Sequence, residues 1–305
     1  MLASLPWLWM PITIGAALAQ TLRNAAQRHL TAELGTLGAT LVRFLYGLPF
    51  AVLWLRLLDG DANGPRSAIA LSFLAWVTIG AAAQIVATAL LLRTMADRNF
   101  ALGVAYSKTE VLQVAVIGFI LLGDPVSLPV AIAVIVATVG VLLISLPAGD
   151  RSFRLFLRGW MSRTALLGLA SGTMFALSAA GYRGAALSLE TAPALAAAYT
   201  LASAQALQTL LLGGWLALRD FAVVVKVLGA WRVSLLAGFM GALASGLWFT
   251  AFALESAVHV RTLGLVELLF SYIVSQKLFR ESLGRSELAG IALLALGIFG
   301  VVGFR

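Results

Sequence analysis

The run NFALGVAYSKTEVLQVAVIGFILLG, residues 99–123, is apolar over most of its length and yet carries Lys108 and Glu110 near its centre. The run is long enough to form a helix across a hydrocarbon core about 30 Å thick. Similar apolar runs recur along nearly the whole chain. The fold therefore depends on whether these runs cross a membrane.

Composition indicates that they do. The 305-residue chain is 61% hydrophobic and 11% charged, whereas a soluble domain is about 45 to 50% apolar and about 25% charged. Polar and apolar residues do not alternate as in a membrane β-barrel, so the sequence predicts an all-α integral membrane protein with ten transmembrane helices. We expect these helices at Leu5–Leu22, Gly35–Leu58, Ala68–Leu92, Phe100–Gly123, Leu128–Leu146, Thr164–Leu189, Ala192–Leu218, Val233–Leu254, Val260–Leu278 and Glu287–Phe304.

Several classes of function find little support in the sequence. Residues 59–67 and 147–163 are the longest polar breaks and leave no room for a soluble domain, and cysteine is absent. The two histidines, His29 and His259, belong to no HExxH motif, and there is no P-loop, so we expect neither an enzyme nor a bound metal or cofactor. The net charge of +8 is spread over short loops, which indicates membrane orientation rather than nucleic-acid binding. A membrane-embedded enzyme, or a sensor or scaffold protein, is the alternative.

The chain contains an internal repeat. At an offset of 160 residues Arg23 aligns with Arg183 and Thr13 with Thr173, and at an offset of 157 residues Glu110 aligns with Glu267. We therefore expect five-helix repeats at 1–147 and 164–305, joined by a linker at 148–163. Because five is odd, the second repeat enters the membrane from the opposite side, as in many secondary transporters.

Three segments resemble the EamA-type repeat of the drug/metabolite transporter superfamily. They are VRF at 42–44, TEVLQVAVIGFILLGDPVSL at 109–128 and VELLFSYIVSQKLFRESLGRSELAGIALLALGIFGV at 266–301. In that repeat a glutamate opens the fourth helix, an acidic residue follows a turn and a glycine lies in the fifth helix. The chain departs from many relatives in having Val111 and Leu268, rather than proline, after the two glutamates.

The resemblance implies a ten-helix permease of the cell membrane, an inner or plasma membrane, that exports small metabolites, often amino acids. It does not identify the substrate. By analogy with inverted-repeat transporters, we expect alternating access about a cavity at the membrane midplane, with a proton as a candidate coupling ion and the protein a monomer or homodimer.

Glu110 is the first candidate for the substrate path. On a helix Tyr106, Glu110 and Gln113 share one face, whereas Lys108 points away from Glu110. A charge in mid-membrane costs about 2.5 to 3.5 kcal/mol on insertion scales, so each must pair or face water. We expect Glu110 to line the path and Lys108 to be held by protein groups; the alternative makes Glu110 a structural partner of Arg43.

Glu267 is the second candidate, with Tyr272 nearby. Two carboxylates related by the repeat could hold an ammonium group or carry a proton, and the alternative is a helix-packing bond. Amino acids or related amines are therefore our leading substrates; an anionic substrate would instead favour Arg43 and Lys108. Further candidate lining residues, which could equally be helix–helix contacts, are Gln20, Asn24, Gln84, Ser178, Tyr182 and Trp248.

Two arguments disagree on orientation. Most basic residues fall in the loops after odd-numbered helices, which places those loops in the cytoplasm and both termini outside. The family resemblance places both termini inside. We favour the orientation that the charge distribution predicts, with both termini outside.

Overall fold

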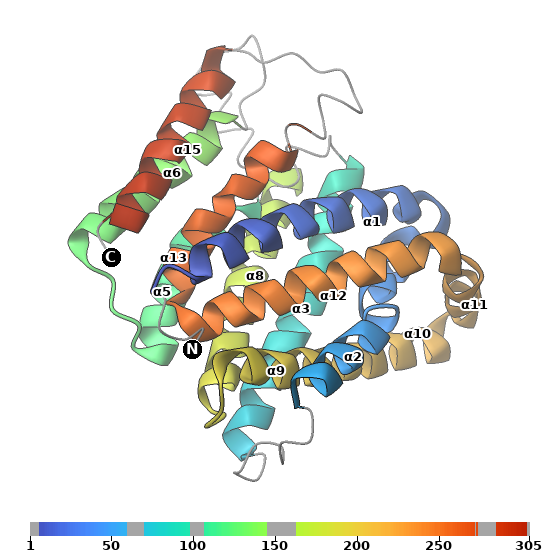
Figure 1. Ribbon diagram of the computed structural model, residues 1–305. Helices are drawn as coiled ribbons and strands as arrows, with labels where there is room; N and C mark the ends of the chain where they lie inside the picture. Colours follow the sequence, from blue (N-terminus) through green and yellow to red (C-terminus); the bar gives the residue numbers. More distant parts are fainter. Residues whose placement is uncertain are drawn as a thin grey trace.

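The computed structural model describes residues 6–59, 70–97, 107–144, 163–271, 273 and 285–303. All regular elements within these residues are helices, arranged as a bundle (Figure 1). Four of the described segments are long and apolar enough to cross a membrane: Trp9–Asp59, Leu71–Ala96, Pro193–Arg219 and Trp231–Leu254. Shorter apolar helices accompany them. The prediction of a helical protein is confirmed, and its apolar helices are compatible with insertion into a membrane.

The first helix is longer than predicted. Helix α1 (Trp9–Leu45) passes through the polar stretch after Leu22, which we had taken as its end, because Arg23, Asn24 and Gln27 are buried in the protein. The helical geometry is interrupted at Gly35, with φ 70° and ψ 173°. Glycine adopts such a positive φ at little cost, so the chain can turn there and continue toward α2 (Leu48–Asp59).

The remaining helices of the first half are α3 (Leu71–Asp97), α5 (Glu110–Leu122) and α6 (Leu128–Ile144). Helix α5 begins at Glu110, after turn residues 108–109. It ends at Gly123 in the left-handed conformation, whose N–H donates to the carbonyl of Phe119 at 3.1 Å. The predicted start at Phe100 lies outside the described residues.

The second half begins with α8 (Arg163–Leu187) and α9 (Pro193–Gln208). A π-helical turn, η2 (Thr209–Gly213), joins α9 to α10 (Gly214–Arg219), so the three together match the predicted seventh helix closely. A short helix, α11 (Phe221–Gly229), follows in a stretch where the sequence predicts no helix. The long helices after it are α12 (Trp231–Leu254) and α15 (Arg285–Gly303).

The predicted ninth helix is broken. It starts earlier than expected, as α13 (Ala257–Leu263), with Ser256 Oγ accepting from the backbone N–H of His259 at its N-terminus. A 3₁₀ turn, η3 (Gly264–Val266), interrupts it, and residues 267–271 are helical again. The break falls immediately before Glu267. Residues 274–284 of the predicted helix and loop lie outside the described residues.

Three helix pairs form the main contacts of the bundle: α1 with α12, α3 with α8, and α6 with α15 (Figure 1). Glycines allow the second and third pairs to approach closely. A Cβ added at Gly181 would lie 2.8 Å from Cα of Gly80, and one added at Gly140 would lie 2.6 Å from the backbone O of Gly290. Such distances leave no room for a side chain, as is usual where small residues bring membrane helices together.

Candidate functional site

Glu110 and Glu267 occupy matching positions at two helix breaks. Glu110 is the first residue of α5 and follows turn residues 108–109, while Glu267 directly follows the 3₁₀ turn η3. Both side chains are buried, with exposed fractions of 2% and 0%. A carboxylate at the start of a helix also faces the positive end of the helix dipole. Each half of the chain thus supplies one buried carboxylate from equivalent local geometry.

Polar groups of α1 and the ammonium of Lys108 surround Glu267. Gln20 Nε2 donates to Oε2 at 2.6 Å, and Asn24 Nδ2 donates to Oε1 at 3.1 Å. Lys108 Nζ lies 2.5 Å from Oε2. Trp248 Nε1 in turn donates to Gln20 Oε1 at 2.9 Å, which fixes the orientation of the amide. Both oxygens of Glu267 therefore already have donors.

Glu110 is held by two cations. Its Oε1 lies 3.3 Å from Arg261 Nη1 and 3.7 Å from Lys108 Nζ. The shorter contact of Lys108 goes to Glu267, so its main partner is in the other half of the chain. Arg43 does not contact Glu110; its Nη1 and Nη2 donate to hydroxyl groups of Thr88 and Ser245 at 3.0 and 3.2 Å. The alternative pairing of Glu110 with Arg43 was therefore wrong.

Two further arginines are buried in the same region. The aliphatic stems of Arg23 and Arg43 both lie against Gly241 of α12, since a Cβ there would be 3.4 Å from Arg23 Cδ and 3.1 Å from Arg43 Cγ. Arg23 donates to Asn24 Oδ1 through Nη2 at 2.6 Å and through Nε at 3.2 Å. Through Asn24, Arg23 is connected to Glu267.

Arg261 was not among the predicted site residues. It is only 6% exposed, and its guanidinium lies 4.6 Å from the ring centroid of Trp248 and 5.1 Å from that of Phe252. Aromatic faces attract cations, so these contacts orient the guanidinium beside Glu110. No sequence signal distinguished Arg261 from a loop arginine.

A second polar network lies between α3, α8 and α9. Tyr182 Oη donates to Gln84 Oε1 at 2.9 Å, and Gln208 Nε2 lies 2.8 Å from the same oxygen and 3.0 Å from Tyr182 Oη. Gln208 was not among the predicted site residues. Ser178 is buried one helical turn before Tyr182 on α8.

The predicted residues thus fall into three sets. The structure brings Glu110, Glu267, Lys108, Gln20, Asn24 and Trp248 into one cluster, and Arg43 packs, like Arg23, against Gly241. It places Gln84, Ser178 and Tyr182 in the second network. Gln113 is half-buried on α5 and joins neither set by a hydrogen bond. Tyr106 and Tyr272 lie outside the described residues.

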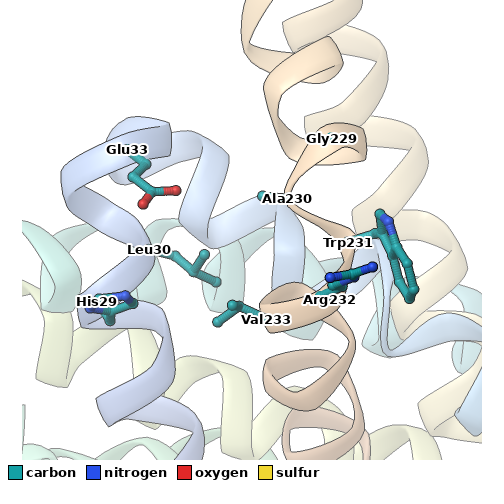
Figure 2. A pocket seen from close by; sticks show the side chains of 8 residues that line it. All are labelled: His29, Leu30, Glu33, Gly229, Ala230, Trp231, Arg232 and Val233. Carbon is teal, nitrogen blue, oxygen red and sulfur yellow. The ribbon is translucent and has the colours of Figure 1, made fainter.

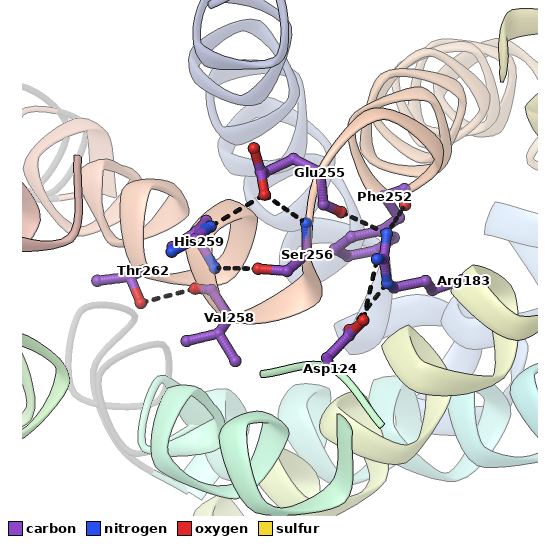
Figure 3. Close-up of polar contacts among 8 residues, drawn as sticks. All are labelled: Asp124, Arg183, Phe252, Glu255, Ser256, Val258, His259 and Thr262. Carbon is purple, nitrogen blue, oxygen red and sulfur yellow. Dashed lines mark hydrogen bonds and ion pairs between the residues drawn. The ribbon is translucent and has the colours of Figure 1, made fainter. Parts of the chain in front are cut away.

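Arg183, the repeat counterpart of Arg23, has a different environment (Figure 3). Its Nε and Nη2 donate to Oδ2 and Oδ1 of Asp124 at 2.8 and 3.0 Å, and its Nη1 donates to the carbonyls of Phe252 and Glu255 at 2.6 and 2.7 Å. The bidentate ion pair with Asp124 connects α8 to the segment after α5. The hydrogen bonds to the two carbonyls connect α8 to the end of α12. We interpret Arg183 as a structural residue.

Two pockets lie away from the charged cluster. The larger, about 410 Å³, is formed by α1 on one side and the α11–α12 junction on the other and is lined by His29, Leu30, Glu33 and residues 229–233 (Figure 2). The other, about 240 Å³, is apolar and lies between α2, α9 and α12. Among the described residues no group of His, Asp and Glu could hold a metal ion.

Comparison with known proteins supports the fold alone. No family model matches the chain, and no curated protein matches it. Solved structures do match, one of them described only as "Crystal structure of protein", with a TM-score of 0.66 and 14% sequence identity over 97% of this chain and 96% of that chain. At this identity the likeness concerns the arrangement of helices over the whole chain and says nothing of activity.

Proposed function

We propose that the chain is a multi-pass secondary transporter of the cell membrane, built as two inverted five-helix repeats and related to the EamA-type permeases. The observation that carries the proposal is the pair of buried glutamates, Glu110 and Glu267, at equivalent helix breaks and bridged by Lys108. Interrupted helices and buried charges between two halves are typical of transporter sites, because irregular backbone and charge are tolerated in a membrane only where protein or a water-filled cavity surrounds them.

The helix contacts are those that an inverted repeat would make. Suppose that α1 corresponds to α8 and that α3 corresponds to α12. Exchange of the two halves then converts the α1–α12 contact into the α8–α3 contact. Both contacts are present. The α6–α15 and α2–α9 contacts each join a helix to its own counterpart. Such pairing supports a pseudo-two-fold axis between the repeats at 1–147 and 164–305.

The proposed mechanism is alternating access around the charged cluster. Rocking of one repeat against the other would open the cluster first to one side of the membrane and then to the other. Small metabolites, with amino acids as the leading candidates, are the proposed cargo, export is the proposed direction, and a proton taken up by Glu110 or Glu267 is the proposed coupling ion.

The test is uptake of labelled amino acids into proteoliposomes by wild-type protein and by Glu110→Gln and Glu267→Gln. Each variant should lose much more transport than folded yield, because glutamine fills the same space, although removal of one charge from a buried ion pair also lowers stability. Glu190→Gln, an exposed glutamate on the loop before α9, is the matched control and should transport normally. Normal transport by both site variants would contradict the role of the carboxylates.

A further inference from the structure

Among the residues that the structure describes, the buried cluster has more positive than negative charge. Its cations are Arg23, Arg43, Lys108 and Arg261, and its anions are Glu110 and Glu267. The remaining buried carboxylate among the described residues, Asp124, is paired with Arg183 outside the cluster. Excess buried charge is strongly unfavourable unless a counter-ion binds.

Proton transfer cannot remove this excess. Arginine stays protonated in proteins, and protonating either glutamate would increase the positive charge. Even a neutral Lys108 would leave three arginines against two carboxylates. The charge is therefore balanced by something that is not a titrating side chain of the cluster.

Unused hydrogen-bond donors point to the same conclusion. Within the described part of the chain, buried nitrogen atoms on three of the arginines have no acceptor: Nη1 of Arg23, Nε of Arg43 and Nε of Arg261. The stems of Arg23 and Arg43 pack against the same glycine, Gly241, so the two side chains lie close together along their stems. A carboxylate accepts hydrogen bonds only and matches the fork of N–H donors on arginine.

The glutamates, in contrast, have little left to offer a cationic ligand. Both oxygens of Glu267 receive hydrogen bonds, from Gln20 and Asn24, and Lys108 adds an ion pair. Glu110 faces Arg261 and Lys108. An amine entering the site would have to displace these cations and would add to the positive excess.

We propose that the transported solute carries a carboxylate, and that Arg23 and Arg43 bind it with Arg261 nearby. This inference rests on the proposed transport function and names its substrate class: small organic anions, or zwitterions held by their carboxylate end. Amines that lack an acidic group are excluded. Amino acids therefore remain candidate substrates, but the arginines recognise their carboxylate. The two glutamates alone would instead have suggested recognition of the ammonium group.

The experiment compares ligands that share a carbon skeleton. Thermal unfolding of the purified protein is measured in detergent with succinate, butyrate, aminobutyrate and butylamine, and again with phenylalanine, phenylpropionate and phenethylamine. A carboxylate that fits should raise Tm by roughly 5 °C at about 100 times its Kd, because it binds only the folded state. Stabilisation confined to amines, no stabilisation by any carboxylate, or an equal effect of sodium chloride alone would overturn the inference.

Variants separate binding from structure. Arg43→Gln should abolish the ligand-induced rise in Tm, yet the ligand-free variant should unfold no earlier than wild type, because it has lost an uncompensated charge. Arg43→Lys, which keeps the charge but loses the fork, should bind more weakly. Arg232→Gln, an exposed arginine at the start of α12, is the control and should behave as wild type. An Arg43→Gln protein that still responds fully to the carboxylate would contradict the assignment.

Transport of the same compounds distinguishes the two proposals. Carboxylates that stabilise the protein but do not cross proteoliposomes would support the site and contradict transport. Transport of amines or uncharged solutes alone would support the transporter and overturn the carboxylate site.

Discussion

Lys108 Nζ lies 2.5 Å from Glu267 Oε2 and 3.7 Å from Glu110 Oε1, so one ammonium contacts the buried carboxylates of both halves of the chain. All three side chains are at most 5% exposed. The bridge joins the two halves of the chain within the charged cluster.

Removal of this ammonium should destabilise the protein. Lys108→Met leaves Glu267 buried with only amide donors, and breaking a buried ion pair from one side costs about 3 to 5 kcal/mol. The Tm in detergent should fall by several degrees. The double variant Lys108→Met with Glu267→Gln should recover part of the loss, because the unpaired anion is also gone; a double variant less stable than either single variant would contradict the pairing.

Close contact between α6 and α15 gives a second prediction. Gly140→Ala would place a methyl group 2.6 Å from Gly290 O and Leu294 N, and such overpacking costs about 1 to 3 kcal/mol. Gly214→Ala, also within a helix, has nothing within 4 Å of the added Cβ and should be neutral or stabilising by up to about 1 kcal/mol. The change in Tm relative to wild type should therefore be a clear decrease for Gly140→Ala and no decrease for Gly214→Ala. Equal stability would mean that the helices are not in contact as described.

Orientation is the third prediction. Arg23 follows the first predicted helix and Arg261 lies at the start of the ninth, so the two fall on opposite sides of the membrane in the predicted topology. Both are buried, and leaving both out does not change the excess of basic residues in the loops after odd-numbered helices. We still expect the linker at 148–163 in the cytoplasm. The sequence contains no cysteine, so a single cysteine at Ser152 can be labelled specifically. An impermeant thiol reagent should react only after cells are permeabilised, and labelling of intact cells would place the linker outside.

The sequence predicted the helices well and the contacts of their polar residues less well. Long apolar runs have one outcome in a membrane, so the ends of α6, α8 and α12 fall within two or three residues of their predicted positions. The predicted end of the first helix at Leu22 was wrong because Arg23 was counted as a loop residue, whereas Arg23, Asn24 and Gln27 are buried within α1. Buried polar side chains satisfy one another across helices, and linear spacing cannot reveal that compensation.

Partners also escaped prediction where the repeat is imperfect. Helical spacing predicted that Lys108 points away from Glu110, but Lys108 is a turn residue whose ammonium lies 3.7 Å from Glu110 Oε1 and closer still to Glu267, on the other half of the chain. Arg23 and Arg183 align in the repeat, yet one lies in the charged cluster and the other pairs with Asp124. The proposed repeat predicts equivalent backbone positions, while the role of each side chain depends on its neighbours, which differ between the two halves.

Alternating access at the cluster is the central claim, and cysteine accessibility tests it most directly. Ser245 is buried on α12, and its hydroxyl accepts from Arg43 at 3.2 Å, so Ser245→Cys places a small probe at the site in a chain without other cysteines. A membrane-impermeant, negatively charged thiol reagent is applied to vesicles of each orientation. The transporter account predicts labelling from both sides of the membrane, slowed by a bound carboxylate; labelling from one side only, or from neither in folded protein, would contradict it.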